Sequence, residues 1–411
     1  MDNEEILEIT GEKNSAVPSA VSRRGFIKIA GAGAAGMAAG RAFGARAQDK
    51  AADHKPPAQA APEIATNGAE IAAIPRTADS MPGRFPGLVV KLDAGRTVVG
   101  GKLDAARAKA AVDAGMAALT GEKDRAKAWR LFVSPRDVVG IKINPIGGRV
   151  ISTKPEVVEA VIAGLAAAGV PKANILIWDR RHHQMADAGF TPGRFPGIEL
   201  AGTEMKGPNG DFYDDKGELW AKNNIDREAG SYRAEVEMEY GKDLMAFMIN
   251  QGKESYFTRI VTRRVTKIIN IPVLKNSGGT CTLCLKNLSY GSLSNTSRLH
   301  KVWAKSVSEP VGFPCLRDKA VLHIADGLQA QYDKGPGANP QFVYDANLMY
   351  FGTDAVAVDA VAHEDLVKVR IDKGVQEFDI ARNREFLDIA AKMGLGVADL
   401  KKISLRETAL G

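Results

Sequence analysis

The sequence predicts an α/β fold: a mainly parallel sheet with helices on both faces and a small, partly antiparallel insertion. A β-branched strand at 138–143, a helix ending near residue 168 and a second strand at 175–178 follow one another. This strand–helix–strand order makes the two strands parallel, with a right-handed crossover. The hydrophobic fraction of 45% and the charged fraction of 25% are those of an ordinary globular protein. Further strands are predicted at 267–271, 320–324 and 348–351.

An export signal is predicted near the N-terminus. The stretch SRRGFIK at 22–28 is typical of a twin-arginine signal, and a run of small apolar residues follows it at 29–43. Ala45 and Ala47 have the spacing that a signal peptidase needs, so we expect cleavage after Ala47 and a periplasmic mature protein. The expected partner in export is the twin-arginine translocase. The apolar run is too short and too rich in Ala and Gly for a stable membrane span.

The composition divides the chain into three regions. Residues 1–47 form the predicted signal peptide, and residues 48–80, rich in Ala and Pro, are predicted to be a flexible tether. Residues 81–411 are predicted to form a single α/β domain. Apolar periodicity weakens at about 198–266, where we expect an insertion with short antiparallel strands and a helix near 242–251.

Local signals mark the ends of the predicted helices. A helix at 104–120 ends at Gly121, which suits a left-handed C-cap. Thr153 and Glu156 have the spacing of a capping box, with Pro155 in the first turn of the next helix. Further helices are predicted from Asp354 through Leu366 and at 384–393.

Charge and cysteine content argue against several classes of protein. The net charge is +6, but no basic run is interleaved with aromatic residues, so nucleic-acid binding is not expected. Three cysteines are too few for a four-cysteine iron–sulfur or zinc site built from this chain alone. Cys281 and Cys284 form a CxxC pair, which suits either redox chemistry or close packing. No thioredoxin-like pattern surrounds the pair, so packing is the preferred interpretation.

Candidate ligand-binding residues follow the predicted strands. In an open parallel sheet, ligands bind beyond the carboxyl ends of the strands, where Asn144, Asp179, Lys275 and Asp326 occur. Asp also caps helices and tolerates turns, so a functional and a structural interpretation both remain open for Asp179 and Asp326. Asp354, after the last of these strands, is better explained as a helix cap.

Two further residues are candidates for other reasons. Asp359 lies in the apolar helical stretch VAVDAV, and a buried carboxylate is costly unless it is paired or binds a cation. Its partner is either a bound cation or a structural lysine or arginine. His300 follows the polar stretch SNTSR, which ends at Arg298 and suits contacts with anions. Among the six histidines, His300 is the preferred acid–base candidate.

Three blocks of sequence resemble the family called domain of unknown function 362 (DUF362). They are VGIKIN at 139–144 with IWDR at 177–180; NIPVLK at 270–275 with LKNLSYG at 285–291; and IADG at 324–327, GPG at 335–337 and DAVAVDA at 354–360. Together they span about 138–369. The resemblance implies an α/β core and, in this branch, twin-arginine export, but no settled reaction.

The chain departs from the family pattern in two ways. Some relatives carry an added ferredoxin-like cluster domain, which the cysteine count excludes here. Relatives also tend to have a histidine soon after the lysine that matches Lys275, where this chain has Asn276 and Ser277. A role that needs that histidine is therefore not expected.

Two functions remain. The first is an exported enzyme or cofactor-handling protein that acts on a small anionic ligand, with its site residues in one crevice. The candidate residues are Lys142, Asn144, Lys275, Asn287 and Arg298 for ligand binding, His300, Lys286 and Asp179 for catalysis, and Asp326 and Asp359 for a divalent cation. The alternative is a non-catalytic periplasmic binding or maturation factor for an exported redox partner.

Overall fold

A large mixed sheet forms the centre of the fold in the computed structural model, which describes residues 63–205, 207, 225–237, 252–278, 280–376 and 380–411. Its main strands are β1 (Leu88–Asp93), β4 (Val139–Lys142), β5 (Ile175–Arg181), β6 (Glu199–Glu204), β9 (Lys267–Asn270), β12 (Ala320–Gln331), β14 (Leu348–Gly352) and β15 (Ser404–Ala409). Their order is β15-β1-β14-β12-β9-β4-β5-β6. Neighbours from β12 to β6 pair in parallel, whereas β14 is antiparallel to both β12 and β1. The predicted mainly parallel sheet is confirmed.

Strand β12 is longer than the sequence predicts and joins two parts of the sheet. Its first half pairs with β9 and β14, and its second half pairs with β10, where Val273 lies opposite Asp326 and Lys275 opposite Gln331. The shorter strands of this sheet are β10 (Val273–Ser277), β11 (Thr280–Thr282) and β13 (Val343–Tyr344).

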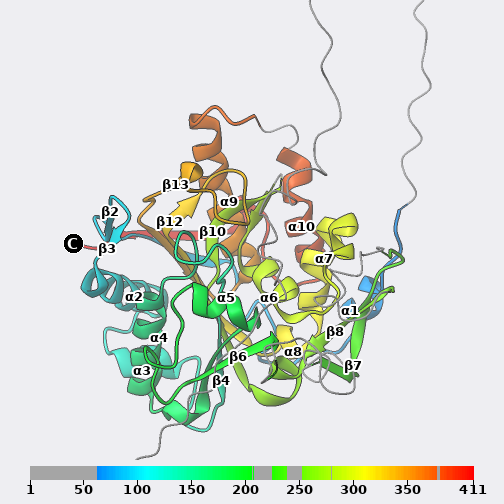
Figure 1. Ribbon diagram of the computed structural model, residues 1–411, viewed down its shortest axis with the longest axis horizontal. Coiled ribbons are helices and arrows are strands. Elements are labelled where there is room, and N and C mark those ends of the chain that lie inside the picture. Colours follow the sequence, from blue (N-terminus) through cyan, green and yellow to red (C-terminus); the bar gives the residue numbers. More distant parts are fainter. Residues whose placement is uncertain (1–62, 206, 208–224, 238–251, 279, 377–379) are drawn as a thin grey trace, which may run out of the picture. The chain divides into compact units, whose positions relative to one another are not determined.

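Helices cover both faces of the sheet, as predicted. Alternate strand residues point to opposite faces: in β5, Ile175 and Ile177 join one apolar core, and Leu176 and Trp178 join the other. In Figure 1 the cyan and green helices α2 to α4 lie to the left and the yellow α6 and α7 to the right. The first core is covered by α2 (Ala105–Thr120), α3 (Arg125–Arg130), α4 (Pro155–Ala168) and α5 (His182–Asp187). The second is covered by α1 (Gly68–Ala72), α6 (Cys284–Ser292), α7 (Trp303–Ser308), α8 (Pro314–Arg317), α9 (Ala355–Asp372) and α10 (Ile380–Lys392).

The ends of the helices confirm two predictions and correct one. Gly121 ends α2 in the left-handed conformation, with φ 76°. Asp354 caps α9 by accepting a hydrogen bond from the backbone N–H of Ala357. The predicted capping box at Thr153 is wrong, because α4 begins without a side-chain cap. The Thr153 hydroxyl instead donates to the carbonyl of Ile271, 2.7 Å away.

The insertion is smaller than predicted. Strand β6 pairs in parallel with β5 and therefore belongs to the main sheet. The expected antiparallel pair is present as β7 (Ile225–Arg233) and β8 (Glu254–Thr258). The helix predicted near 242–251 lies outside the described residues. A second small pair is formed by β2 (Val98–Val99) and β3 (Lys102–Leu103).

The folded region begins before residue 81. Ile71 in α1 is 1% exposed, and Asn67 exchanges hydrogen bonds with the backbone of Ser231 and Arg233. These contacts correct the predicted tether over 63–80, because apolar burial and backbone pairing hold this segment in place. The proposed signal peptide lies outside the described residues. No helix in the described part of the chain is long and apolar enough to cross a membrane.

Candidate functional site

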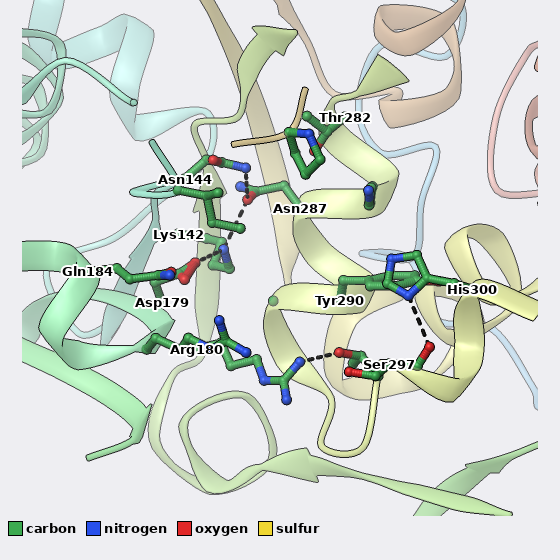
Figure 2. A pocket seen from close by; sticks show the side chains of 16 residues that line it. Lys142, Asn144, Asp179, Arg180, Gln184, Thr282, Asn287, Tyr290, Ser297 and His300 are labelled. Carbon is green, nitrogen blue, oxygen red and sulfur yellow. Dashed lines mark hydrogen bonds and ion pairs between the residues drawn. The ribbon is translucent and has the colours of Figure 1, made fainter. Parts of the chain in front are cut away.

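A pocket of about 200 Å³ opens at the carboxyl ends of β4 and β5, beside α6 (Figure 2). Parallel neighbouring strands bring their carboxyl ends to one edge of a sheet, which explains why polar residues from separate segments meet here. The predicted site residues that line the pocket are Lys142, Asn144, Asp179, Lys286, Asn287 and His300. The structure therefore brings together six of the ten residues that the sequence suggested.

Lys142 and Asp179 form a buried ion pair in the wall of the pocket. The Lys142 Nζ lies 2.5 Å from Asp179 Oδ1, 3.0 Å from Asn287 Oδ1 and 2.7 Å from the carbonyl of Ile143. These acceptors use all three ammonium protons, and Figure 2 shows Lys142 between Asp179 and Asn287. Burial lowers the pKa of Lys142, while Asp179 opposes that shift. Gly291 leaves room for the lysine, since a Cβ there would lie 2.2 Å from Lys142 Cε.

An amide network continues from this ion pair into the pocket. Asn287 accepts a second hydrogen bond from Asn144 Nδ2 at 3.3 Å and donates to Asn270 Oδ1 at 2.8 Å. Asn144 Oδ1 is buried and has no hydrogen-bond partner among the described residues. A buried oxygen without a partner is costly, so Asn144 offers a ready acceptor to a ligand that enters the pocket.

Arg180 and Arg181 add positive charge to the pocket and were not among the residues predicted for the site. Both share one carboxylate: Glu204 Oε1 lies 2.5 Å from Arg180 Nε, and Glu204 Oε2 lies 3.1 Å from Arg181 Nε. Arg180 also donates from Nη1 to Thr296. Its buried Nη2 has no hydrogen-bond partner in the described part of the chain. The signal available was the DRR triplet, which directly follows the apolar part of β5.

Lys286 enters the pocket from the first turns of α6. Its Nζ donates to the Ser277 hydroxyl and lies 4.6 Å and 5.4 Å from the ring centres of Trp303 and Tyr290. No carboxylate forms an ion pair with Lys286 within the described ranges. Burial lowers its pKa to about 8. Lys286 is thus a buried amine whose neighbours are aromatic rings and a hydroxyl group rather than a carboxylate.

His300 lies at the exposed rim of the pocket. Its Nδ1 is 3.1 Å from the carbonyl of Ser297, and its ring meets Tyr290 edge-on with 5.2 Å between the ring centres. A carbonyl only accepts, so Nδ1 donates and the basic nitrogen of the neutral ring is Nε2. Although the residue as a whole is exposed, the protein atoms around the ring displace water and lower the pKa of His300.

Lys275 and Arg298 do not line this pocket, which corrects their predicted role in ligand binding. The Lys275 Nζ donates to the carbonyl of Ile146, 2.6 Å away, and so supports the loop that carries Asn144. Burial lowers the pKa of Lys275 to about 7. Arg298 donates to the carbonyl of Ala234 at 3.1 Å and to the hydroxyl of Ser255 at 2.8 Å. It therefore links β8 to the segment that follows β7.

Asp326 and Asp359 also lie outside the pocket lining, which corrects their predicted role as metal ligands. Asp326 accepts hydrogen bonds from the backbone N–H groups of Lys154 and Leu328. Asp359 accepts from Cys284 N at 2.7 Å and Leu285 N at 3.0 Å, so it caps α6 from a neighbouring helix. Among the described residues, no group of three or more His, Cys, Asp or Glu side chains could hold a metal ion.

The CxxC pair does not line the pocket. Cys281 and Cys284 are both buried and free. Burial raises the pKa of both thiols well above the ordinary value, which keeps them protonated and unreactive. This environment agrees with the packing interpretation.

Comparison with known proteins now identifies the family. The family model described as Domain of unknown function (DUF362) matches residues 139–364. The chain belongs to the DUF362 family. Every residue that lines the pocket lies within this matched DUF362 range, and the predicted resemblance is confirmed.

Comparisons outside the family model add little. A search of the curated proteins found no match. One similar solved structure is the crystal structure of a Thermotoga maritima protein from the Northeast Structural Genomics Consortium, with 10% sequence identity and a TM-score of 0.34. The alignment covers 67% of this chain and 60% of that one, so the chain spans less than two thirds of that protein's length.

Proposed function

We propose that this DUF362 protein binds a small anionic ligand in the pocket beside α6. The observation that carries the proposal is charge: four cationic side chains line the pocket, whereas only two carboxylates pair with them, Asp179 with Lys142 and Glu204 with both arginines. The remaining cations are Arg180, Arg181 and Lys286. The volume is below the roughly 300–1,000 Å³ of pockets for drug-sized ligands, which favours a ligand of few atoms.

The polar groups suggest how such an anion would be held. Arg180 Nη2 and Lys286 Nζ supply charged donors, and hydrogen bonds to an anion from charged donors are the strong ones. Asn144 Oδ1 would accept from a hydroxyl or amine of the same ligand. A small molecule that combines an anionic group with a hydrogen-bond donor therefore fits best.

Anion binding can be tested by calorimetry with inorganic phosphate, sulfate and pyruvate at low ionic strength. Arg181→Gln removes one cation from the wall, while Glu204 keeps its partner Arg180. We expect the affinity to fall about tenfold, since hydrogen bonds to charged groups contribute roughly 1.5–3 kcal/mol. Arg136→Gln, at an exposed position outside the pocket, is the matched control and should leave affinity unchanged. Failure of all three anions to bind, or equal weakening in both variants, would contradict the proposal.

An anion-binding pocket of this kind suits two alternative functions: an enzyme, or a non-catalytic binding factor for an exported redox partner. Two groups that line the pocket favour turnover. They are Lys286, an amine with a lowered pKa, and His300, an imidazole with a lowered pKa. Proton NMR spectra of pyruvate incubated with the protein would distinguish these two functions. Chemical change of the anion supports an enzyme, whereas tight binding without change supports the binding factor.

We also propose export by the twin-arginine route, on the basis of the stretch SRRGFIK and the alanines before the expected cleavage point. Replacing Arg23 and Arg24 together by Lys should leave uncleaved precursor in the cytoplasm. Immunoblots of cell fractions measure this. The matched control is Arg41→Lys, which changes an arginine outside the pair. Normal maturation of the double variant would rule out the twin-arginine assignment.

A further inference from the structure

We propose that Lys286 forms an imine with the carbonyl group of a small oxo anion, such as a 2-oxo acid, whose negative group binds Arg180 and Arg181. This inference rests on the proposed anion binding and names the class of ligand. Two observations carry it: Lys286 lines a cationic pocket without an acidic partner, and its buried amine lies against a neutral hydroxyl group and two aromatic rings.

The contrast between two lysines of the pocket shows which one is available to react. Lys142 gives its three protons to Asp179, Asn287 and a carbonyl oxygen. Lys286 donates to the neutral hydroxyl of Ser277 and otherwise faces aromatic rings. An ammonium group held by a carboxylate stays charged, whereas one among neutral groups gives up its proton more readily.

The surroundings of Lys286 favour its neutral, nucleophilic form. Burial is the main cause that brings its pKa to about 8. Lys286 also lies in the first turn of α6, where the helix dipole disfavours a cation. Desolvation in an apolar setting is a means by which amine nucleophiles are activated. At neutral pH the neutral fraction is on the order of a hundredfold above that of an exposed lysine.

The proposed step balances without an oxidant or reductant. The Lys286 nitrogen attacks the carbonyl carbon, and one amine proton moves to the carbonyl oxygen to give a carbinolamine. The C–O bond then breaks, the hydroxyl group leaves as water after it takes up a proton, and the nitrogen gives up its second proton. His300 lines the same pocket and can carry these protons at Nε2. The sum is amine plus carbonyl giving imine plus water.

The experiment traps the imine in the full-length protein. Pyruvate and sodium cyanoborohydride are added near neutral pH, and the reduced adduct is found by intact mass spectrometry and peptide mapping. Acetone, the same methyl ketone without the carboxylate, is the matched ligand control. We expect one adduct, on Lys286, formed at least about tenfold faster with pyruvate than with acetone, because the arginines bind only the anion. Parallel arms with glyoxylate and glycolaldehyde phosphate compare a carboxylate with a phosphate as the anionic group.

Two variants and one binding measurement decide the result. Lys286→Arg should abolish the adduct, and Lys123→Arg, at an exposed position outside the pocket, should not change it. If Lys286→Arg does not fold, the peptide map of the unaltered protein still identifies the modified lysine. Reversible pyruvate binding by calorimetry with no adduct on Lys286 would overturn the imine and leave anion binding intact. Absence of both the adduct and pyruvate binding would overturn the imine, and failure of phosphate and sulfate to bind as well would overturn anion binding. Adducts spread evenly over surface lysines would also overturn the imine.

Discussion

Replacing Asp179 by Asn is expected to lower the free energy of unfolding by about 3–5 kcal/mol, the usual cost of breaking a buried ion pair by removing one partner. Lys142 is 0% exposed and lies 2.5 Å from Asp179, so the substitution leaves a buried ammonium group without its counter-charge. Asn keeps the volume of the side chain, which isolates the effect of charge. Urea denaturation followed by circular dichroism measures the loss.

The pH dependence of this loss has a definite sign. Burial already lowers the pKa of Lys142 below its ordinary value, and removal of Asp179 lowers it further. Between this lowered folded pKa and the unfolded pKa of about 10.4, the unfolded chain binds more protons than the folded one, so stability rises with pH. The deficit of Asp179→Asn should therefore be larger at about pH 6 than at about pH 9.

Two further variants control the interpretation of Asp179→Asn. Asp187→Asn changes an exposed aspartate in the nearby α5 and should alter stability by less than about 0.5 kcal/mol. Combining Lys142→Met with Asp179→Leu removes both charges and should recover most of the lost stability. A single variant as stable as the unaltered protein at both pH values would show that the pair does not stabilise the fold.

Part of this site was visible in the sequence because it depends on local rules. Asn144 follows β4 and Asp179 lies near the end of β5, and the two strands are parallel neighbours. Because the carboxyl ends of parallel strands meet at one edge of a sheet, the sequence predicted that these residues lie together, as they do in the pocket. The same rule failed for Asp326, because β12 continues to Gln331. Gly327, which suggests the end of a strand, is instead required by close packing: a Cβ there would lie 2.7 Å from the carbonyl oxygen of Leu348.

The other features of the site could not be predicted, because they depend on contacts between segments that are distant in sequence. Arg180 and Arg181 resemble a solvated charged pair until Glu204 of β6 is seen to bind both. Asp359 was recognised as an unusual buried carboxylate, but its partners were expected to be a cation or a basic side chain. Its partners are backbone N–H groups of another helix, and a backbone donor leaves no signal in the sequence.

Replacing Asp359 by Ala is expected to lower the free energy of unfolding by about 2–5 kcal/mol, since two buried N–H groups at the start of α6 lose their acceptor and each unsatisfied group costs about 1–3 kcal/mol. The unfolding temperature should fall with it. Because α6 also carries Lys286 and Asn287, the folded fraction of the variant should bind anions more weakly than the unaltered protein. Thermal denaturation and calorimetry on the same preparation measure both effects.

The charge state of Asp359 gives this prediction a pH signature. Burial raises its pKa from 3.8 to about 7, so between these values the folded protein binds more protons than the unfolded chain. The contribution to stability is then fully present below the unfolded pKa and is lost as the pH rises through about 7. Asp359→Ala should lack this component, whereas Asp388→Ala, at an exposed position in α10, should retain it and unfold like the unaltered protein. Unchanged stability together with lost anion affinity would instead mean that the Asp359 carboxylate faces the ligand, as the sequence first suggested.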